Sequence, residues 1–191
     1  MGDPKRDKKK YETPRVPWSL QTLEAELRLL GEYGLRNKRE LWRHKTKVSR
    51  YRKLARSLLG KPAKERSKAE NILLSKLRRE GLVSEGANLD DVLDLTVNDA
   101  LERRLQTLVF RKGLAKTIQQ ARQLITHGHI AIGPRIVRVP SYHVTVEEEG
   151  NIGYAASSPL AKEDHPLRVT IEAVQSSQKI KEAAAEFQAS P

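Results

Sequence analysis

The chain has 191 residues, a formal net charge of +12 and no cysteine. This length suits one or two domains with a modest core, and the missing cysteines exclude disulfides and thiolate metal sites. No apolar run approaches the roughly 20 residues that span a bilayer, and no signal peptide follows Met1. Aromatic residues make up only 5%, which disfavours a membrane-surface helix, so we expect a soluble intracellular protein without a membrane partner.

The positive charge falls into two blocks. Residues 1–82 are basic, residues 83–102 contain acids but neither Lys nor Arg, and residues 103–143 contain eight Lys or Arg and no acid. A folded patch with one sign of charge repels itself, so a partner is expected to supply the negative charge. Two separated basic blocks favour a partner large enough to touch both, and the obvious polyanion is nucleic acid.

The first half of the chain predicts an extended arm and three helices. Residues 1–18 are Lys-rich and interrupted by proline, which is typical of an arm. Cap and stop signals predict helices over 19–31, 37–60 and 62–80. Their expected inward positions are Leu20, Leu23, Leu27 and Leu30; then Leu41, Val48, Tyr51, Ala55, Leu58 and Leu59; then Ala69, Ile72, Leu73 and Leu77.

The second of these helices carries a basic face opposite its apolar face. At about 100° per residue the face comprises Arg39, Arg43, Lys47, Arg50 and Lys53. A charged stripe is usually a solvated surface. Here Glu40 is the only acid among the Lys and Arg residues between Arg36 and Arg56, which favours phosphate contact.

An acidic connector follows over residues 84–94 and ends in a short helical turn at 90–95. It can fold back on a basic face or remain solvated, and the solvated interpretation is favoured.

The strongly basic segment predicts a small folded module. Thr96 with Asp99 caps one helix that runs to Gly113, and Thr117 caps a second that runs to Gly128. Segments 130–132 and 136–137 around a Gly-Pro turn predict a hairpin. The basic residues on this helix-turn-helix-hairpin unit are Arg103, Arg104, Arg111, Lys112, Lys116, Arg122, Arg135 and Arg138.

Several motifs of this segment resemble a known RNA-binding module. LERRL at 101–105, RKG at 111–113, QARQLI at 120–125, HGHI at 127–130 and PSY at 140–142 are similar to the S-four-type, or alpha-L, RNA-binding domain. YGLRNKRELW at 33–42 and LQTLVF at 105–110 resemble the archaeal and eukaryotic branch of the small-subunit ribosomal protein four family. The resemblance covers most of residues 5–172.

The resemblance implies an α+β, mostly helical fold with a helical lobe, the RNA-binding module and a short C-terminal β-segment. The expected divisions are a basic arm over 1–18, the helical lobe and acidic connector over 19–102, the module over 103–167, and a β-segment with a flexible tail over 168–191.

The resemblance also implies a function. A member of this family is a structural ribosomal protein, located on the ribosome in the cytoplasm. It binds small-subunit ribosomal RNA directly at a multi-helix junction, nucleates assembly of the subunit body and contributes to decoding accuracy. Its expected partners are that RNA and neighbouring small-subunit ribosomal proteins, without homo-oligomers or cofactors.

The RNA contacts are expected mainly from arginine, whose planar fork grips phosphate bidentately. For each arginine the alternative is an internal ion pair, with Glu102 or the acidic connector as the nearest source of a carboxylate. Gln123 can bond a ribose or phosphate, and Tyr142 can stack on a base or pack on the hairpin. For His127 and His129, RNA contact or a role at the C-terminus of the helix is favoured over metal binding, because no acid or cysteine accompanies them.

No catalytic arrangement stands out, since the chain lacks a Gly-rich phosphate loop and a nucleophile-base pattern. The Glu147–Glu149 run is interpreted as a solvated turn. The alternative functions are an RNA-modifying enzyme or a ribosome-rescue factor carrying the same module. An enzyme would need a further catalytic domain, and a rescue factor would lack the helical lobe with Trp42.

Overall fold

The structure is a computed structural model that describes residues 9–162, 165–171, 173 and 174. The chain divides into two compact units between Leu101 and Glu102. Both are mainly helical, and the second carries a small antiparallel sheet, which confirms the mostly helical α+β fold. None of the helices in the described part of the chain combines the length and apolarity needed to cross a bilayer.

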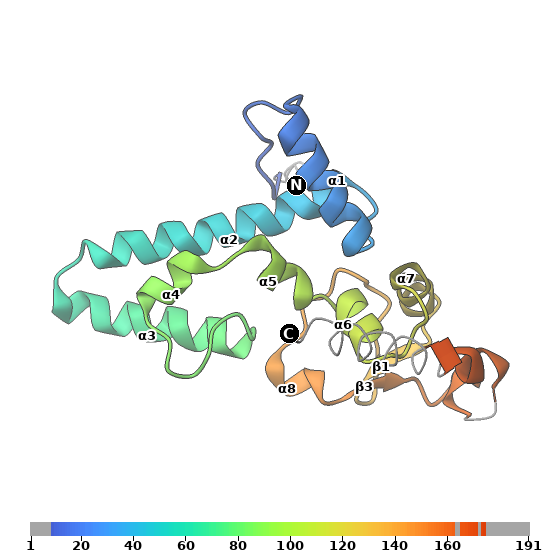
Figure 1. The fold of residues 1–191 in the computed structure, drawn as a ribbon. Coiled ribbons are helices and arrows are strands. Elements are labelled where there is room, and N and C mark those ends of the chain that lie inside the picture. The colour runs from blue at the N-terminus through green and yellow to red at the C-terminus, as the bar shows by residue number, and fades with distance from the viewer. Residues whose placement is uncertain (1–8, 163–164, 172, 175–191) are drawn as a thin grey trace, which may run out of the picture. The chain divides into compact units, whose positions relative to one another are not determined.

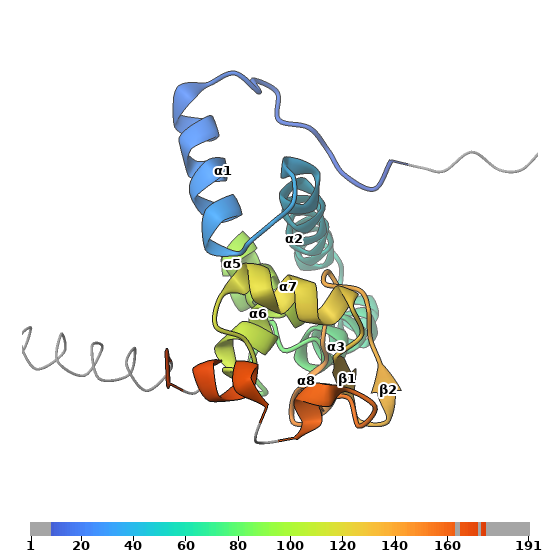
Figure 2. The same cartoon turned by 90° about the vertical axis from the view of Figure 1, so that its right-hand side faces the viewer.

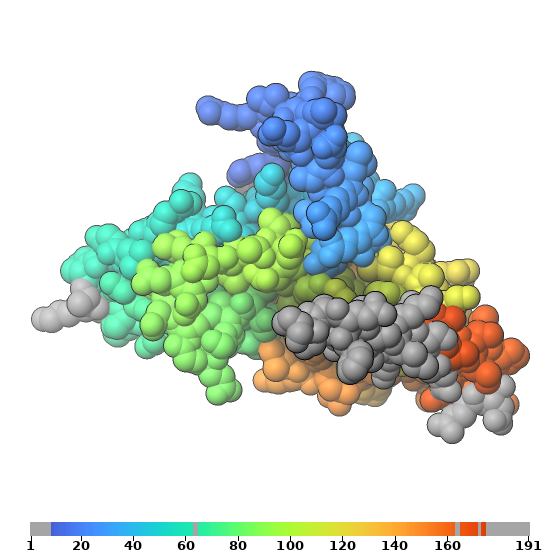
Figure 3. Space-filling model, viewed as in Figure 1, coloured from blue at the N-terminus to red at the C-terminus, as the bar shows by residue number. Residues whose placement is uncertain are grey.

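The first unit consists of helices (Figure 1). Their bounds are α1 Leu20–Glu32, α2 Lys38–Leu59, α3 Ala63–Arg79, α4 Leu89–Asp94 and α5 Val97–Glu102. The long helices α2 and α3 run side by side, and Figure 3 shows α4 packed against them. The core of this packing contains Tyr51, Leu77, Leu89 and Val92.

The acidic connector has two faces. Leu89 and Val92 of α4 are buried against α2. Asp90, Asp91 and Asp94 are exposed. The connector therefore folds back on α2 through its apolar side while its carboxylates remain solvated.

Three expected inward faces are wrong in part. Leu59 of α2 is 37% exposed. Leu20 and Leu27 of α1 are 69% and 58% exposed, and Ile72 of α3 is 70% exposed. In α1 the buried position is Glu26, which accepts a hydrogen bond from the Trp42 indole at 2.9 Å. Periodicity identified helical segments there but placed these apolar side chains on the wrong side.

The second unit surrounds one apolar core with short elements (Figure 2). They are α6 Leu105–Arg111, α7 Ile118–Thr126, β1 Ile130–Ile132, β2 Arg135–Ile136, α8 Val146–Glu149, β3 Ile152–Tyr154 and the 3-10 turn η1 Pro159–Ala161. The sheet has the order β2-β1-β3 with antiparallel neighbours. Ala131 pairs with Ile136 on one side and with Gly153 on the other.

The single helix expected from Thr96 to Gly113 is instead two helices, α5 and α6. Between them the backbone of residues 103–105 pairs with residues 142–144: the Leu105 N–H donates to the Tyr142 carbonyl at 2.8 Å, and the Val144 N–H donates to the Arg103 carbonyl at 3.0 Å. This long-range pairing replaces helical hydrogen bonds. No local pattern in the sequence could reveal it.

The expected β-segment from residue 168 is also wrong for the residues that the structure describes. Residues 166–171, 173 and 174 are helical, and the third strand is Ile152–Tyr154. The rest of the expected tail, from residue 175, lies outside the described residues.

Candidate nucleic-acid interface

The predicted basic face lies on α2, whose first turn is capped by Asn37. The Asn37 side chain accepts a hydrogen bond from the Glu40 N–H at 3.1 Å and so caps the first turn. Leu41, Val48 and Ala55 are buried on the opposite side. The predicted cationic residues of this face are Arg39, Arg43, Lys47, Arg50 and Lys53. All of them are exposed except Lys47, which is half-buried.

A cation-lined pocket of about 240 Å³ opens on this face. Its described lining residues are Lys10, Arg43, Lys47, Arg50, Tyr51 and Lys76. We call it the basic pocket. Three segments build it: the arm, which is tied to α2 by a 2.9 Å hydrogen bond from the Glu12 N–H to the Thr46 hydroxyl, then α2 itself, and α3.

The one described lining residue of the basic pocket that is not Lys or Arg is Tyr51. The Tyr51 hydroxyl donates to Glu80 at 3.0 and 3.1 Å, and Lys47 pairs with Glu80 at 2.7 Å. Lys47 and Lys76 lie 5.7 and 5.6 Å from the centre of the Tyr51 ring. Burial, followed by the charge and hydrogen bond of Glu80, raises the pKa of Tyr51, so the phenol is neutral at physiological pH.

We expect the basic pocket to attract anions, because five of its six described lining residues are Lys or Arg and only Lys47 among them pairs with a carboxylate within the described part of the chain. Lys10 and Lys76 are absent from the face predicted on α2. Helical periodicity cannot find them, since one belongs to the arm and the other to α3. The excess of Lys and Arg in residues 1–18 was the only signal for the first.

The predicted RNA-binding residues of the second unit are of three kinds: exposed, half-buried and, for Arg104, fully buried. Those that are exposed are Arg111, Lys112, Lys116, Gln123, His127, Arg135 and Arg138. Those that are half-buried are Arg103, Arg122 and His129.

Arg104 is fully buried, at 0% exposure. Its backbone pairs with His143 in an isolated antiparallel bridge, which draws the side chain into the unit. This corrects the sequence-based assignment of Arg104 to the RNA surface, because a side chain without solvent access cannot meet a phosphate group.

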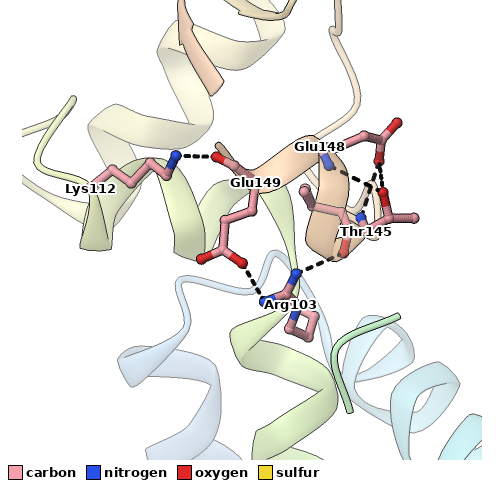
Figure 4. Close-up of polar contacts among 6 residues, drawn as sticks. Arg103, Lys112, Thr145, Glu148 and Glu149 are labelled. Carbon is pink, nitrogen blue, oxygen red and sulfur yellow. Dashed lines mark hydrogen bonds and ion pairs between the residues drawn. The ribbon is translucent and has the colours of Figure 1, made fainter. Parts of the chain in front are cut away.

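Arg103 and Lys112 bond to α8, the helix that contains the Glu147–Glu149 run (Figure 4). Arg103 pairs with the Glu149 carboxylate at 2.6 Å and donates to the Val144 carbonyl at 3.3 Å. Lys112 donates to the backbone carbonyl of Glu149. The acidic run is therefore not simply a solvated turn, and the internal partner of Arg103 comes from downstream rather than from the connector.

Two further internal contacts affect the predicted cations. Arg111 pairs with Glu102 at 3.0 Å on the surface. This is the internal ion pair that the sequence offered as the alternative to RNA contact. Arg122 donates to the Gln106 side-chain oxygen at 3.2 Å. Exposed ion pairs contribute about 0–1 kcal/mol, so phosphate can compete for Arg111 at little cost.

Tyr142 packs against the module and also takes part in a polar cluster. Its ring contacts the core, and its hydroxyl donates to Glu148 at 2.8 Å and accepts from Arg135 at 3.2 Å. The hydrogen bond to Glu148, followed by burial, raises the pKa of Tyr142. Burial works to raise the pKa of Glu148, but hydrogen bonds from the Thr145 N–H, the Tyr142 hydroxyl and the Thr145 hydroxyl outweigh it and lower that pKa. Figure 4 shows the contacts between Thr145 and Glu148.

The turn after α7 brings two histidines and one arginine together. The His127 and His129 rings are nearly parallel, with centres 6.3 Å apart. Gly128 has φ +81°, and the Arg138 Nε atom lies 3.0 Å from where a Cβ would be. A side chain at Gly128 would therefore strain the turn and displace Arg138. The described residues bring no three His, Cys, Asp or Glu side chains together as a metal site would require.

Both units of the chain match families of known proteins. Residues 5–102 match the family of the ribosomal protein S4/S9 N-terminal domain, and residues 103–149 match the S4 domain. The chain is 56% identical over 162 residues to small ribosomal subunit protein uS4 of Ignicoccus hospitalis, covering 85% of this chain and 98% of the relative. It is 54% identical to the protein of the same name from Hyperthermus butylicus, covering 85% and 92%.

The comparisons agree with the residues that suggested the family, from the YGLRNKRELW segment to the HGHI turn. They also cover the arm, α2 and α3, which together build the basic pocket. With both units matched and two relatives more than half identical over nearly their whole lengths, this chain belongs to the uS4 family of small ribosomal subunit proteins.

Proposed function

We propose that this chain is a structural protein of the small ribosomal subunit and that it binds the ribosomal RNA of that subunit directly. Family membership supports the place of action, since the relatives are named as small ribosomal subunit proteins. The observation that carries the RNA contact is the presence of a basic surface in each unit. These are the basic pocket with its α2 face, and the exposed cations of the second unit.

The surfaces suit recognition of the RNA backbone. The deep major groove of an A-form helix is too narrow for side chains, so exposed Arg and Lys groups meet phosphates and follow the shape of a helical junction. In the second unit the contacting set is Arg111, Lys112, Lys116, Arg135 and Arg138, with Arg103 and Arg122 made available only if RNA displaces their internal partners.

The finer role is part of the same proposal. Binding at a multi-helix junction orders the RNA of the subunit body, nucleates assembly and contributes to decoding accuracy. Neighbouring small-subunit proteins contact the chain there, in the cytoplasm. The chain acts as a monomer and uses no cofactor or membrane.

The test is binding of the purified full-length chain to transcribed small-subunit RNA, measured over a range of salt concentrations. We expect one protein per RNA, a footprint confined to one junction, and a salt dependence equivalent to several phosphate contacts at about 0.7–0.9 each. Large-subunit RNA of similar length serves as the control. Equal affinity for both RNAs, or a slope below about three contacts, would overturn the proposal.

The alternative functions have a direct test as well. Incubation of the chain and RNA with a methyl donor or a nucleoside triphosphate is expected to leave the RNA unmodified, as judged by mass spectrometry of the digested RNA. A modified nucleotide formed at a reproducible rate would support an enzyme instead.

A further inference from the structure

A second pocket, of about 450 Å³, lies in the second unit beside α7. Leu124 of α7 and Leu160 of η1 are both buried and give it an apolar floor, and Pro159 and Leu167 extend the apolar wall. We call it the α7 pocket. It is separate from the exposed arginines described above, none of which lines it.

Polar groups with unused bonding capacity surround this floor. The Gln123 side chain is exposed and forms no hydrogen bond within the described part of the chain, so its amide offers both donors and an acceptor. His127 and His129 present rings inclined by only 22° to each other. The His129 ring is fixed by a 2.9 Å hydrogen bond between its Nδ1 and the Ser158 hydroxyl.

The charge of the α7 pocket narrows the choice of ligand. No residue among its described lining is acidic, and Arg122 is the single charged side chain of α7. A phosphate is a poor occupant of the pocket itself, because the apolar floor would strip its water and its described lining, which includes His127, His129 and His165, contains neither Lys nor Arg. The ligand should instead be flat, with apolar faces and hydrogen-bonding edges.

We propose that the α7 pocket binds one unstacked nucleobase of the bound RNA. The inference rests on the proposed function, to which it adds base recognition beside the backbone contacts. The base lies against Leu124 and the histidine rings, and the Gln123 amide bonds its edge. Unpaired bases are the part of RNA that proteins read by stacking on aromatic rings and by edge hydrogen bonds. A side-chain amide can pair with such an edge in bidentate fashion.

The experiment uses the full-length chain and small-subunit RNA. Gln123→Ala and His127→Ala remove the edge and stacking groups, and Gln119→Ala is the matched control because Gln119 is exposed on the same helix but does not line the pocket. We expect each pocket variant to weaken binding on the order of tenfold, the scale of one lost base stack. The salt slope should stay unchanged, as should binding to large-subunit RNA and the affinity of the control.

The base itself is found by ultraviolet crosslinking and mass spectrometry of the peptide that contains Gln123 and His127. Replacing the crosslinked nucleotide by an abasic one should weaken binding of the parent chain by a similar factor. The same replacement should weaken the binding of Gln123→Ala by a smaller factor than that of the parent chain, because the variant has already lost the edge interaction and only the stacking remains to be removed.

The outcomes separate this inference from the proposed function. A salt slope lowered by one contact in Gln123→Ala would indicate a phosphate site and overturn the base pocket. Pocket variants that bind RNA like the parent chain would also overturn the base pocket. The α7 pocket would then be interpreted as a site for a side chain of a neighbouring protein, and the proposed function would stand. If the parent chain itself failed to prefer small-subunit RNA, both proposals would fall.

Discussion

Three arginines that look equivalent in the sequence have different surroundings in the fold. Arg104 is buried, Arg103 is held by Glu149, and Arg138 is exposed beside Gly128. Net charge therefore overstates the number of cations that are available to RNA. Residue-scale experiments should separate those that stabilise the fold from those that bind.

Arg104→Ala is expected to lower the free energy of unfolding by about 3 kcal/mol, because it truncates a large side chain with no solvent exposure. Arg138→Ala is the matched control, since its side chain is exposed, and should change stability by about 0.5 kcal/mol or less. Urea unfolding measures both. A variant of Arg104 that unfolds like the parent chain would contradict its structural role.

The lowered pKa of Glu148 predicts that the stability of the protein depends on pH. Its folded pKa is lowered below the ordinary 4.5, so its hydrogen bonds add stability above that pH, and this stability is lost as the pH falls through the folded pKa. Glu148→Gln should therefore be less stable than the parent chain at neutral pH, and the two should converge as the pH falls below 4.5 and through the lowered folded pKa of Glu148. Thermal unfolding between pH 7 and pH 3 tests this. Glu147→Gln, which changes an exposed neighbour, should follow the parent chain throughout.

At the scale of elements, local signals succeeded where the chemistry is local. Asn37 and Thr117 cap their helices through side-chain hydrogen bonds. At Thr96 one half of the predicted capping box is present, because the Thr96 N–H and hydroxyl donate to the Asp99 carboxylate. Elements set by distant partners were missed. The break between α5 and α6 depends on pairing with residues 142–144, and the outward position of Leu27 accompanies the burial of Glu26 in α1.

The caps allow a controlled comparison. The Thr117 hydroxyl accepts from the Gln120 N–H at 3.2 Å, whereas Ser19 at the start of α1 forms no side-chain cap bond. Thr117→Ala should therefore lower the free energy of unfolding by about 1 kcal/mol, and Ser19→Ala should cost less. Chemical denaturation of the two variants measures both losses in the free energy of unfolding. An equal loss at both positions would show that the cap bond is not the cause.

The basic pocket gives a prediction about binding. Lys10→Gln and Lys76→Gln each remove a cation from it without touching the α2 face. The double variant should lower the salt slope for small-subunit RNA by about 1.5, from two phosphate contacts at ~0.7–0.9 each. Lys61→Gln is the control, because Lys61 is an exposed lysine outside the pocket. A double variant with the parent slope would place the RNA elsewhere on the first unit.

For the whole molecule, the sequence identified the family, the two basic blocks and most exposed cations. It could not identify Lys10 and Lys76 as part of one pocket, because the arm, α2 and α3 meet only through tertiary packing. The pairing of Arg103 with Glu149 was hidden for the same reason, since 46 residues separate the partners.

If both surfaces engage one RNA molecule, their contributions to the salt slope should add. Neutralising Arg39, Arg43, Arg50 and Lys53 should lower the slope by about 3, as should neutralising Arg111, Lys112, Arg135 and Arg138. The combined variant should lose about twice as much, with helical content preserved by circular dichroism. If either set alone abolished the salt dependence, only one unit would touch the RNA.

The separate cores also bear on how the protein is made. The apolar clusters of the first unit draw their buried residues from Tyr33 to Leu101, and that of the second begins at Leu105. Chains are synthesised from the N-terminus, and domains generally fold as units in that order. The arm, α2 and α3 can therefore assemble their basic pocket while the second unit is still being translated, so the nascent chain presents a finished cation-lined surface before its synthesis ends.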